Sequence, residues 1–328
     1  MKKNYFSEFV RKNMAWVILL VIVIIFTCLS PNFLSLTNIL NILAQNAYVV
    51  VAAIGISILM MSGSMDIAVG YLMSLCGVCA GLLLVKAGMP TFPAILLTLL
   101  LGVGLSMLTT LIAKLLRISR FMVSVGTMTI FQGLSFVVSG SVSIKGFPDS
   151  FKLLGQGYFF GIPFPIILMF ILLIIMSFLM NKTYFGSYVY ALGGNEEAAR
   201  LAGIHVHLME MIISALAGGF VALAALMLVS RLGSAHSLTG PGTEFTVITG
   251  ILLGGVSIRG GEGKLSGVFA GILIVAILAN GMQLAGLDTY YQFIAKGVIM
   301  LAAIGFDVYQ LSRRQRVKLN PDSPKTNG

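Results

Sequence analysis

Long apolar runs, separated by short polar or glycine-rich gaps, dominate the sequence. A helix needs about 20 mostly apolar residues to cross a bilayer, and the stretch from Asn13 to Ala113 holds only two formal charges, Asp66 and Lys86. Hydropathy and loop chemistry predict ten spans, over residues 14–30, 39–61, 66–86, 91–113, 121–140, 163–181, 208–230, 244–257, 265–285 and 289–309. The expected fold is therefore all-α: a polytopic transmembrane helical bundle of about ten spans.

Two stretches depart from the pattern of straight spans. The predicted span 244–257 is short, and glycine-rich sequence covers residues 60–70 and 250–263. Both features predict broken or re-entrant helices, which a membrane tolerates only where protein or a water-filled cavity surrounds the backbone. Pairs of glycines four residues apart predict close helix packing: Gly77 and Gly81, Gly250 and Gly254, and Gly267 and Gly271.

Composition excludes an ordinary soluble enzyme, because 58% of the residues are hydrophobic and only 10% are charged, against roughly 25% charged in soluble domains. The net charge of +10 could suggest nucleic acid as a partner. However, the basic residues gather at the chain ends and in short gaps between apolar runs, as they do on the cytoplasmic side of membrane proteins. We therefore expect the protein to lie in the lipid membrane, and we expect no nucleic-acid partner.

The distribution of charge also predicts the topology. Sixteen of the 21 Lys and Arg residues fall on one predicted side: Lys2, Lys3, Arg11, Lys12, Lys114, Arg117, Arg120, Lys182, Arg200, Arg259, Lys264, Arg313, Arg314, Arg316, Lys318 and Lys325. Both termini are therefore predicted to be cytoplasmic. We expect a cytoplasmic tail over 1–13, a transmembrane domain over 14–309 with a cytoplasmic loop over 182–207, and a cytoplasmic tail over 310–328.

A short helix is predicted in that cytoplasmic loop. Asn195 can cap its N-terminus, and Glu196 and Glu197 then lie in the positive first turn. Arg200 lies near the negative end, and Gly203 suits the position just after the helix. About seven residues are too few for a helix that is stable alone, so the segment is either a connecting turn or a docking element. A small apolar face favours docking: Ala198, Ala199, Leu201 and Ala202.

Polar residues inside the apolar runs are candidate functional residues. An ionisable group within a membrane protein is by default a functional-site hypothesis, but Asp66 could equally cap the helix predicted to follow it. Neutral polar side chains recur within the spans, where they could line a path for an uncharged, hydroxyl-rich solute or join helices by hydrogen bonds. They are Asn38, Asn41, Gln45, Asn46, Gln132, Ser135, Asn280, Gln283 and Gln292.

Motifs for catalysis, nucleotide binding or metal binding are missing from the sequence. A phosphate-binding loop needs G-x-x-x-x-G-K-[ST], and Gly263-Lys264 fails because Ile258 and Leu265 occupy the other two defined positions. His205-x-His207 has no convergent carboxylate or cysteine, so no metal site is predicted. Energy for transport would have to come from a partner protein or from an ion gradient.

Four stretches carry a resemblance to a known family: 63–70 (GSMDIAVG), 125–134 (VGTMTIFQGL), 194–200 (GNEEAAR) and 254–263 (GGVSIRGGEG). In this order and spacing the chain resembles the membrane permease subunits of bacterial ATP-binding cassette (ABC) importers for monosaccharides, in the ribose-type branch. The resemblance runs from Phe33 to Asp307. The chain has Ile67-Ala68 where the family has Leu-Ser, and Gln132 where the family usually has Arg. Both departures bear on the choice of substrate.

The resemblance implies a non-catalytic subunit of the bacterial plasma (inner) membrane that forms the path for a monosaccharide or similar polyol. Such permeases pair as homodimers or heterodimers, a periplasmic or extracellular sugar-binding protein delivers the substrate, and a separate ABC ATPase holds ATP and magnesium. This chain itself is expected to bind no cofactor. The alternative hypothesis is a secondary transporter of a small polar solute driven by an ion gradient, but the chain offers few intramembrane acids beyond Asp66.

Two sets of residues follow from this resemblance as candidates. Coupling to the ATPase would use the loop helix and its ends: Asn195, Glu196, Glu197, Ala198, Ala199, Arg200 and Gly203. The translocation path or its gate would use Asn41, Gln45, Asn46, Asp66, Gln132, Asn280 and Gln283.

Overall fold

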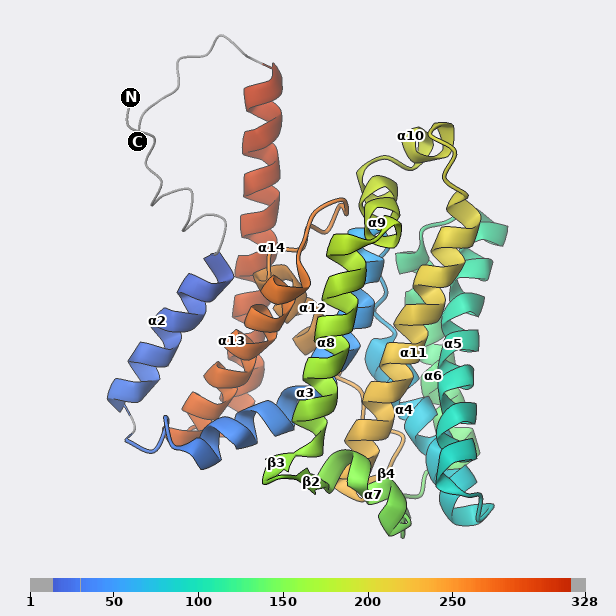
Figure 1. Ribbon diagram of the computed structural model, residues 1–328, viewed down its shortest axis with the longest axis vertical. Helices are drawn as coiled ribbons and strands as arrows, with labels where there is room; N and C mark the ends of the chain where they lie inside the picture. The colour runs from blue at the N-terminus through green and yellow to red at the C-terminus, as the bar shows by residue number, and fades with distance from the viewer. Residues whose placement is uncertain (1–13, 30, 320–328) are drawn as a thin grey trace.

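A computed structural model describes residues 14–29 and 31–319 (Figure 1). Its helices are α2 (Met14–Leu29), α3 (Leu36–Met61), α4 (Val69–Gly81), the π-helical turn η1 (Leu82–Lys86), α5 (Thr91–Leu116), α6 (Arg120–Ser139), α7 (Asp149–Gln156), α8 (Phe164–Lys182), α9 (Tyr184–Gly194), α10 (Glu196–Leu201), α11 (Val206–Leu232), α12 (Thr243–Leu253), α13 (Leu265–Leu284) and α14 (Thr289–Leu319). The predicted tail over 1–13 and the last nine residues of the other tail lie outside the described residues.

Within residues 14–29 and 31–319, four very short strands form two antiparallel pairs. β1 (Ile144–Lys145) pairs with β4 (Ser234–Ala235), and β2 (Tyr158–Phe159) pairs with β3 (Ile162–Pro163). All four lie at the end of the bundle opposite α9 and α10 (Figure 1). The remainder of the fold is helical, as the hydropathy pattern predicts.

Within the described residues, seven helices are long and apolar enough to cross a membrane: α3, α4 with η1, α5, α6, α8, α11 and α13. Three shorter apolar helices, over 14–28, 243–253 and 290–305, coincide with the other three predicted spans. The chain is therefore a multi-pass helical membrane protein. The number of crossings and the side on which the termini lie stay predictions.

Several predicted boundaries are wrong because hydropathy marks the apolar core of a segment and not the ends of its helix. Helix α3 begins earlier than residue 39, where Ser35 Oγ accepts the Asn38 N–H at 3.3 Å. Helix α4 begins at Val69 and not at residue 66, and α12 ends at Leu253. Helix α14 continues to Leu319, past the predicted end at 309, because a helix can extend beyond its apolar segment.

Helices α3 and α11 form the centre of the bundle. In each, 72% of the apolar window is buried within the chain, against 28% in α5, α6 and α8, which therefore lie at the periphery of the bundle. Close backbone contact joins the centre to its neighbours. A Cβ added to Gly102 of α5 would lie 2.5 Å from Ala222 Cβ, and one added to Gly218 of α11 would lie 2.2 Å from the Gly102 carbonyl oxygen.

Glycine pairs also join α12 to α13, as their spacing predicts. A Cβ at Gly271 would lie 1.9 Å from the Gly250 carbonyl oxygen, and one at Gly267 would lie 2.2 Å from that of Gly254. The predicted breaks are present as well. The chain is irregular between α3 and α4, and α12 has only 11 residues before an irregular segment over 254–264.

The N-terminal ends of α4 and α12 meet inside the bundle. The Gly240 N–H donates to Ser74 Oγ at 2.9 Å, and a Cβ on Gly70 would lie 2.2 Å from the buried Glu244 carboxylate. That carboxylate accepts the Gly242 N–H through both oxygens, each at 3.0 Å. A buried backbone donor at these breaks therefore finds a side-chain acceptor, which an apolar environment requires.

Replacing Gly102 by valine is expected to lower the melting temperature of the detergent-purified protein, because overpacking a tight contact costs about 1–3 kcal/mol. Gly104→Val on the same helix is the matched control, since no atom lies within 4 Å of a Cβ at that position. Thermal unfolding followed by size-exclusion chromatography measures both. Equal melting temperatures for the two variants would contradict the close crossing of α5 and α11.

Candidate functional site

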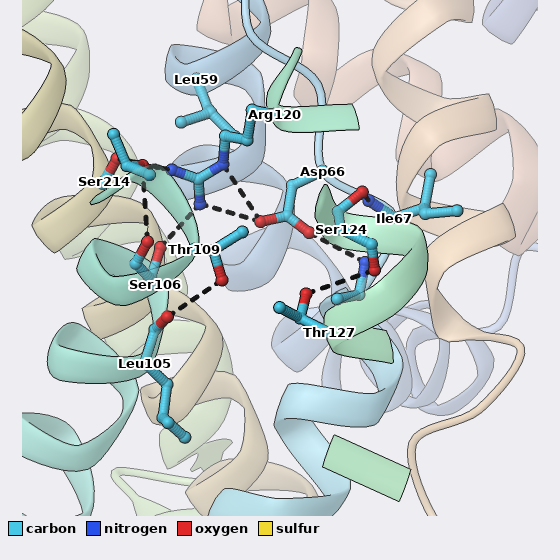
Figure 2. Close-up of polar contacts among 12 residues, drawn as sticks. Leu59, Asp66, Ile67, Leu105, Ser106, Thr109, Arg120, Ser124, Thr127 and Ser214 are labelled. Carbon is cyan, nitrogen blue, oxygen red and sulfur yellow. Dashed lines mark hydrogen bonds and ion pairs between the residues drawn. The ribbon is translucent and has the colours of Figure 1, made fainter. Parts of the chain in front are cut away.

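A buried ion pair joins the irregular segment 62–68 to the start of α6. Arg120 Nη2 lies 2.8 Å from Asp66 Oδ2, and Arg120 Nε donates to the same oxygen at 3.3 Å (Figure 2). Each residue is only 7% exposed. Arg120 is the first residue of α6, directly after Ser119, whose hydroxyl accepts the Met122 N–H at 3.4 Å. The helix cap therefore fixes where the guanidinium enters the bundle.

Hydroxyl groups surround the rest of the guanidinium. Arg120 Nη2 also donates to Ser106 Oγ at 2.9 Å, and Nη1 donates to Ser214 Oγ at 2.5 Å and to Thr110 Oγ1. Ser106 and Thr110 lie on α5 and Ser214 lies on α11, so the pair connects three helices to segment 62–68 (Figure 2). A buried charge is stable only when it is both paired and hydrogen-bonded, and this site meets both conditions.

Asp66 does not act as the N-cap of α4. The helix begins at Val69 with Ala68 in the cap position, and Asp66 Oδ1 accepts the Ala68 N–H at 2.8 Å in a local turn before the helix. The Ile67 N–H donates to Ser124 Oγ at 3.2 Å, which adds a second link to α6. The cap interpretation is therefore wrong, and the other carboxylate oxygen is used by Arg120.

Sequence reasoning missed Arg120 as a site residue and counted it only as a cytoplasmic positive charge. The available signal was its position at the edge of the apolar run 121–140, in a chain whose first half carries a single intramembrane acid. An acid and a base that both lie at the edge of apolar segments are candidates for pairing, because each is costly to bury alone.

An open cleft of about 920 Å³ lies beside the ion pair, between the end of α3, the turn from α5 to α6, α10 and the start of α11. Its charged lining residues are Lys114, Arg117, Arg120, Arg200, Glu196 and Glu210. Lys114 forms an ion pair with Glu210 and contacts His207 Nδ1. Arg120 and residues of α10 therefore line the same cleft.

The short helix in the loop has the predicted capping. Asn195 Oδ1 accepts the Ala198 N–H at 3.0 Å, and Glu196 and Glu197 occupy the first turn. Arg200 Nη2 lies 3.9 Å from Glu196 Oε1, and Gly203 follows the helix with φ +86°, a conformation that favours glycine. The helix, α10, spans six residues, Glu196–Leu201.

The apolar residues of α10 divide into an inner and an outer set. Ala199 is 3% exposed and faces the chain itself, whereas Leu201 is 85% exposed, and Ala198 and Ala202 are exposed too. Ala199 therefore supports the helix from within. A protein docking on α10 would contact Ala198, Leu201 and Ala202.

Backbone contacts join the base of α10 to the broken segments. The Gly261 N–H donates to the Met61 carbonyl oxygen at 2.8 Å, and a Cβ on Gly193 would lie 2.0 Å from that oxygen. A Cβ on Gly260 would lie 2.6 Å from Gly63 Cα. The end of α9, segment 62–68 and segment 254–264 therefore touch directly.

The predicted path residues do not converge with Asp66. Asn38 and Asn280 exchange side-chain hydrogen bonds of 3.0 Å between α3 and α13, and Gln132 Nε2 donates to the Ser237 carbonyl oxygen at 3.0 Å. Asn46 Nδ2 donates to its own helix, to Ile42 O at 2.8 Å. The remaining three, Asn41, Gln45 and Gln283, are exposed on the surface of the chain.

Metal ligands are not clustered in the part of the chain that the structure describes, where no group of three or more His, Cys, Asp or Glu side chains could hold an ion. Cys76 and Cys79 lie within α4, and both are free thiols.

Comparison with known proteins identifies relatives over nearly the whole chain. A family model described as "Branched-chain amino acid transport system / permease component" matches residues 38–304. The ribose import permease protein RbsC of Bacillus subtilis is 36% identical, covering 93% of this chain and 95% of the relative. The galactose/methyl galactoside import permease protein MglC of Escherichia coli is 32% identical, covering 96% and 99%. No solved structure matches the chain.

Arg120→Met is expected to destabilise the protein strongly, because removing one partner of a buried ion pair costs about 3–5 kcal/mol. Asp66→Asn combined with Arg120→Met should recover part of that loss, since no charge is then left buried alone. Melting temperatures of the purified variants measure both effects.

Lys152→Ala is the control for that experiment. Lys152 Nζ donates to Asp149 at 2.8 Å in an exposed pair on α7, and this hydrogen bond lowers the pKa of the Asp149 carboxyl. Losing an exposed pair should leave the melting temperature unchanged. A melting temperature for Arg120→Met equal to that of Lys152→Ala would contradict the role of the buried pair.

Proposed function

The chain belongs to the branched-chain amino acid transport system / permease component family, as a ribose-type ABC permease, and we propose that it forms the membrane path of an ATP-driven importer of a monosaccharide or similar polyol. The names of its relatives support the sugar class: over more than nine-tenths of the chain it is similar to ribose and galactose/methyl galactoside import permeases. Neutral amide side chains within the apolar segments suit an uncharged, hydroxyl-rich substrate.

The exposed position of helix α10 is the observation that best supports coupling to a separate ATPase. Its N-cap and its first-turn acids stabilise the helix locally, and the buried Ala199 packs it against the chain. Leu201 is 85% exposed and directly follows Arg200, on a helix whose first turn carries Glu196 and Glu197. An apolar side chain held outward on a short, capped helix fits an apolar pocket of a partner protein. The ATPase would hold ATP and magnesium, and this chain would be non-catalytic.

The Asp66–Arg120 pair is the proposed gate. It fixes segment 62–68, which leads into the broken helix α4, and it lies beside the cleft under α10. Movement of α10 would reach segment 62–68 through the contacts of Gly193 and Gly261 with Met61. Opening would then separate the hydroxyl shell of Arg120 on α5 and α11 from the carboxylate.

The remaining assignments follow from the family. The α10 end of the bundle would face the cytoplasm, since Lys114, Arg117 and Arg200 lie there. Two permease chains would pair as a homodimer or heterodimer, and an extracytoplasmic sugar-binding protein would deliver the substrate. The complex would reside in the bacterial inner membrane.

Leu201→Asp is expected to weaken association with the cognate ATPase. Losing the burial of one leucine costs about 1.5–3 kcal/mol, which corresponds to about tenfold or more in affinity. Co-purification of the ATPase and ATP hydrolysis by the complex measure the effect, with expression and melting temperature of the permease as checks on folding. Leu201→Met, which keeps the apolar contact, is the matched control. Wild-type association of Leu201→Asp would make α10 a mere connector.

The energy source is tested in proteoliposomes that contain the permease, the ATPase and the binding protein. Sugar uptake should follow ATP hydrolysis and persist when ionophores collapse the proton and sodium gradients. The permease alone should neither hydrolyse ATP nor accumulate sugar. Gradient-driven uptake by the permease alone would instead identify an ion-coupled secondary transporter.

A further inference from the structure

The hairpin of β2 and β3 lies at the end of α8 opposite α10 (Figure 1), and three successive aromatic residues occupy it. Tyr158 is 73% exposed, Phe159 is 60% exposed and Phe160 is 92% exposed. The rings of Phe159 and Phe160 meet edge to face with centroids 4.7 Å apart. We propose that this hairpin is a membrane anchor whose aromatic tip inserts into the lipid headgroup region.

The turn of the hairpin places a phenylalanine in a backbone conformation that this residue type disfavours. Strand pairing places Tyr158 opposite Pro163 and Phe159 opposite Ile162, so Phe160 and Gly161 are the two turn residues. Both have positive φ, +50° and +79°. Turns of this kind favour Asn-Gly, and positive φ is costly for a bulky side chain. A phenylalanine that is both strained and 92% exposed gains nothing from water, but it gains apolar contact from lipid.

The position of the hairpin identifies lipid as its partner. The Phe164 N–H donates to the Gly157 carbonyl oxygen at 2.8 Å, so the hairpin closes directly onto the first residue of α8, a helix long and apolar enough to cross the membrane. The exposed apolar surface continues along α8 through Ile171, Ile174 and Phe178. No charged residue occurs from 153 to 181.

Interfacial chemistry matches these side chains. Tyr and Trp concentrate at both surfaces of a bilayer, where an apolar ring and a polar tip suit the headgroup level. A surface that binds a soluble protein usually carries a polar rim, and this hairpin has no charged side chain. The anchor would fix the depth and tilt of α8, which packs on α3 and α7.

A single-tryptophan experiment tests the proposal, because Trp16 is the only tryptophan in the chain. In a Trp16→Phe background, Phe160→Trp places the reporter at the hairpin tip. Ile174→Trp in the middle of α8 is the lipid reference, and Leu201→Trp on α10 is the water reference. Each protein is reconstituted in phosphatidylcholine nanodiscs, with or without bromine near the headgroup end of the acyl chains, and is titrated with iodide.

The Phe160→Trp reporter should lose fluorescence in brominated lipid at least as strongly as Ile174→Trp, and it should resist iodide where Leu201→Trp is quenched. Quenching by iodide without loss in brominated lipid would overturn the proposal and leave the tip in water, free for a soluble protein. Resistance to both quenchers would also overturn it, because the tip would then be buried against protein, such as a second copy of the chain. Tyr158→Trp in the same background repeats the measurement if Phe160→Trp does not fold.

Discussion

Every backbone N–H and C=O group inside a bilayer needs a partner within the protein, and this constraint decides where the chain can depart from helix. The departures in this protein lie against one another. Gly261 N–H is satisfied by the Met61 carbonyl oxygen, Gly240 N–H by Ser74 and Ile67 N–H by Ser124. The backbone N–H groups of the irregular segments therefore find their hydrogen-bond acceptors in other parts of the protein interior. The glycines permit these contacts because any side chain would separate the backbones.

The Asp66–Arg120 pair depends on the same arrangement. Segment 62–68 can hold a carboxylate inside the bundle only because α5, α6 and α11 surround it with a guanidinium and hydroxyl groups. In a low-dielectric interior such a network is stable as a whole and costly when it is partly broken. A buried pair of this kind suits a two-state element, because the closed arrangement satisfies every member and an open one requires water or new partners. Arg120 also lines the cleft beside α10, so the buried pair lies next to an opening at the surface of the bundle.

Two short elements at opposite ends of the bundle expose apolar side chains in different electrostatic settings. Leu201 lies beside Arg200 and within a few residues of Glu196 and Glu197, on the exposed side of α10. Phe160 lies in a charge-free stretch that runs directly into a membrane-spanning helix. Charged surroundings favour a water-exposed surface that meets a protein, whereas uncharged surroundings continuous with a span favour lipid. The two elements illustrate why exposure alone does not identify a partner.

The sequence by itself determined the features that depend on local chemistry. Hydropathy located all ten apolar segments, glycine spacing predicted close helix packing at Gly250, Gly254, Gly267 and Gly271, and residues 195–203 specified a capped helix. These follow from side-chain transfer energies, backbone freedom and caps, all of which act over a few residues.

Only the tertiary structure decided which distant groups meet. The sequence around Asp66 allows either a helix cap or a functional ionisable group, and it gives no sign of the partner Arg120, which lies 54 residues away. Ala199 and Leu201 both belong to the apolar set of α10, and packing alone placed one inside and the other outside. Such pairings depend on how helices cross, and a helix crossing is set by the summed contacts of many residues rather than by the pattern of any one segment.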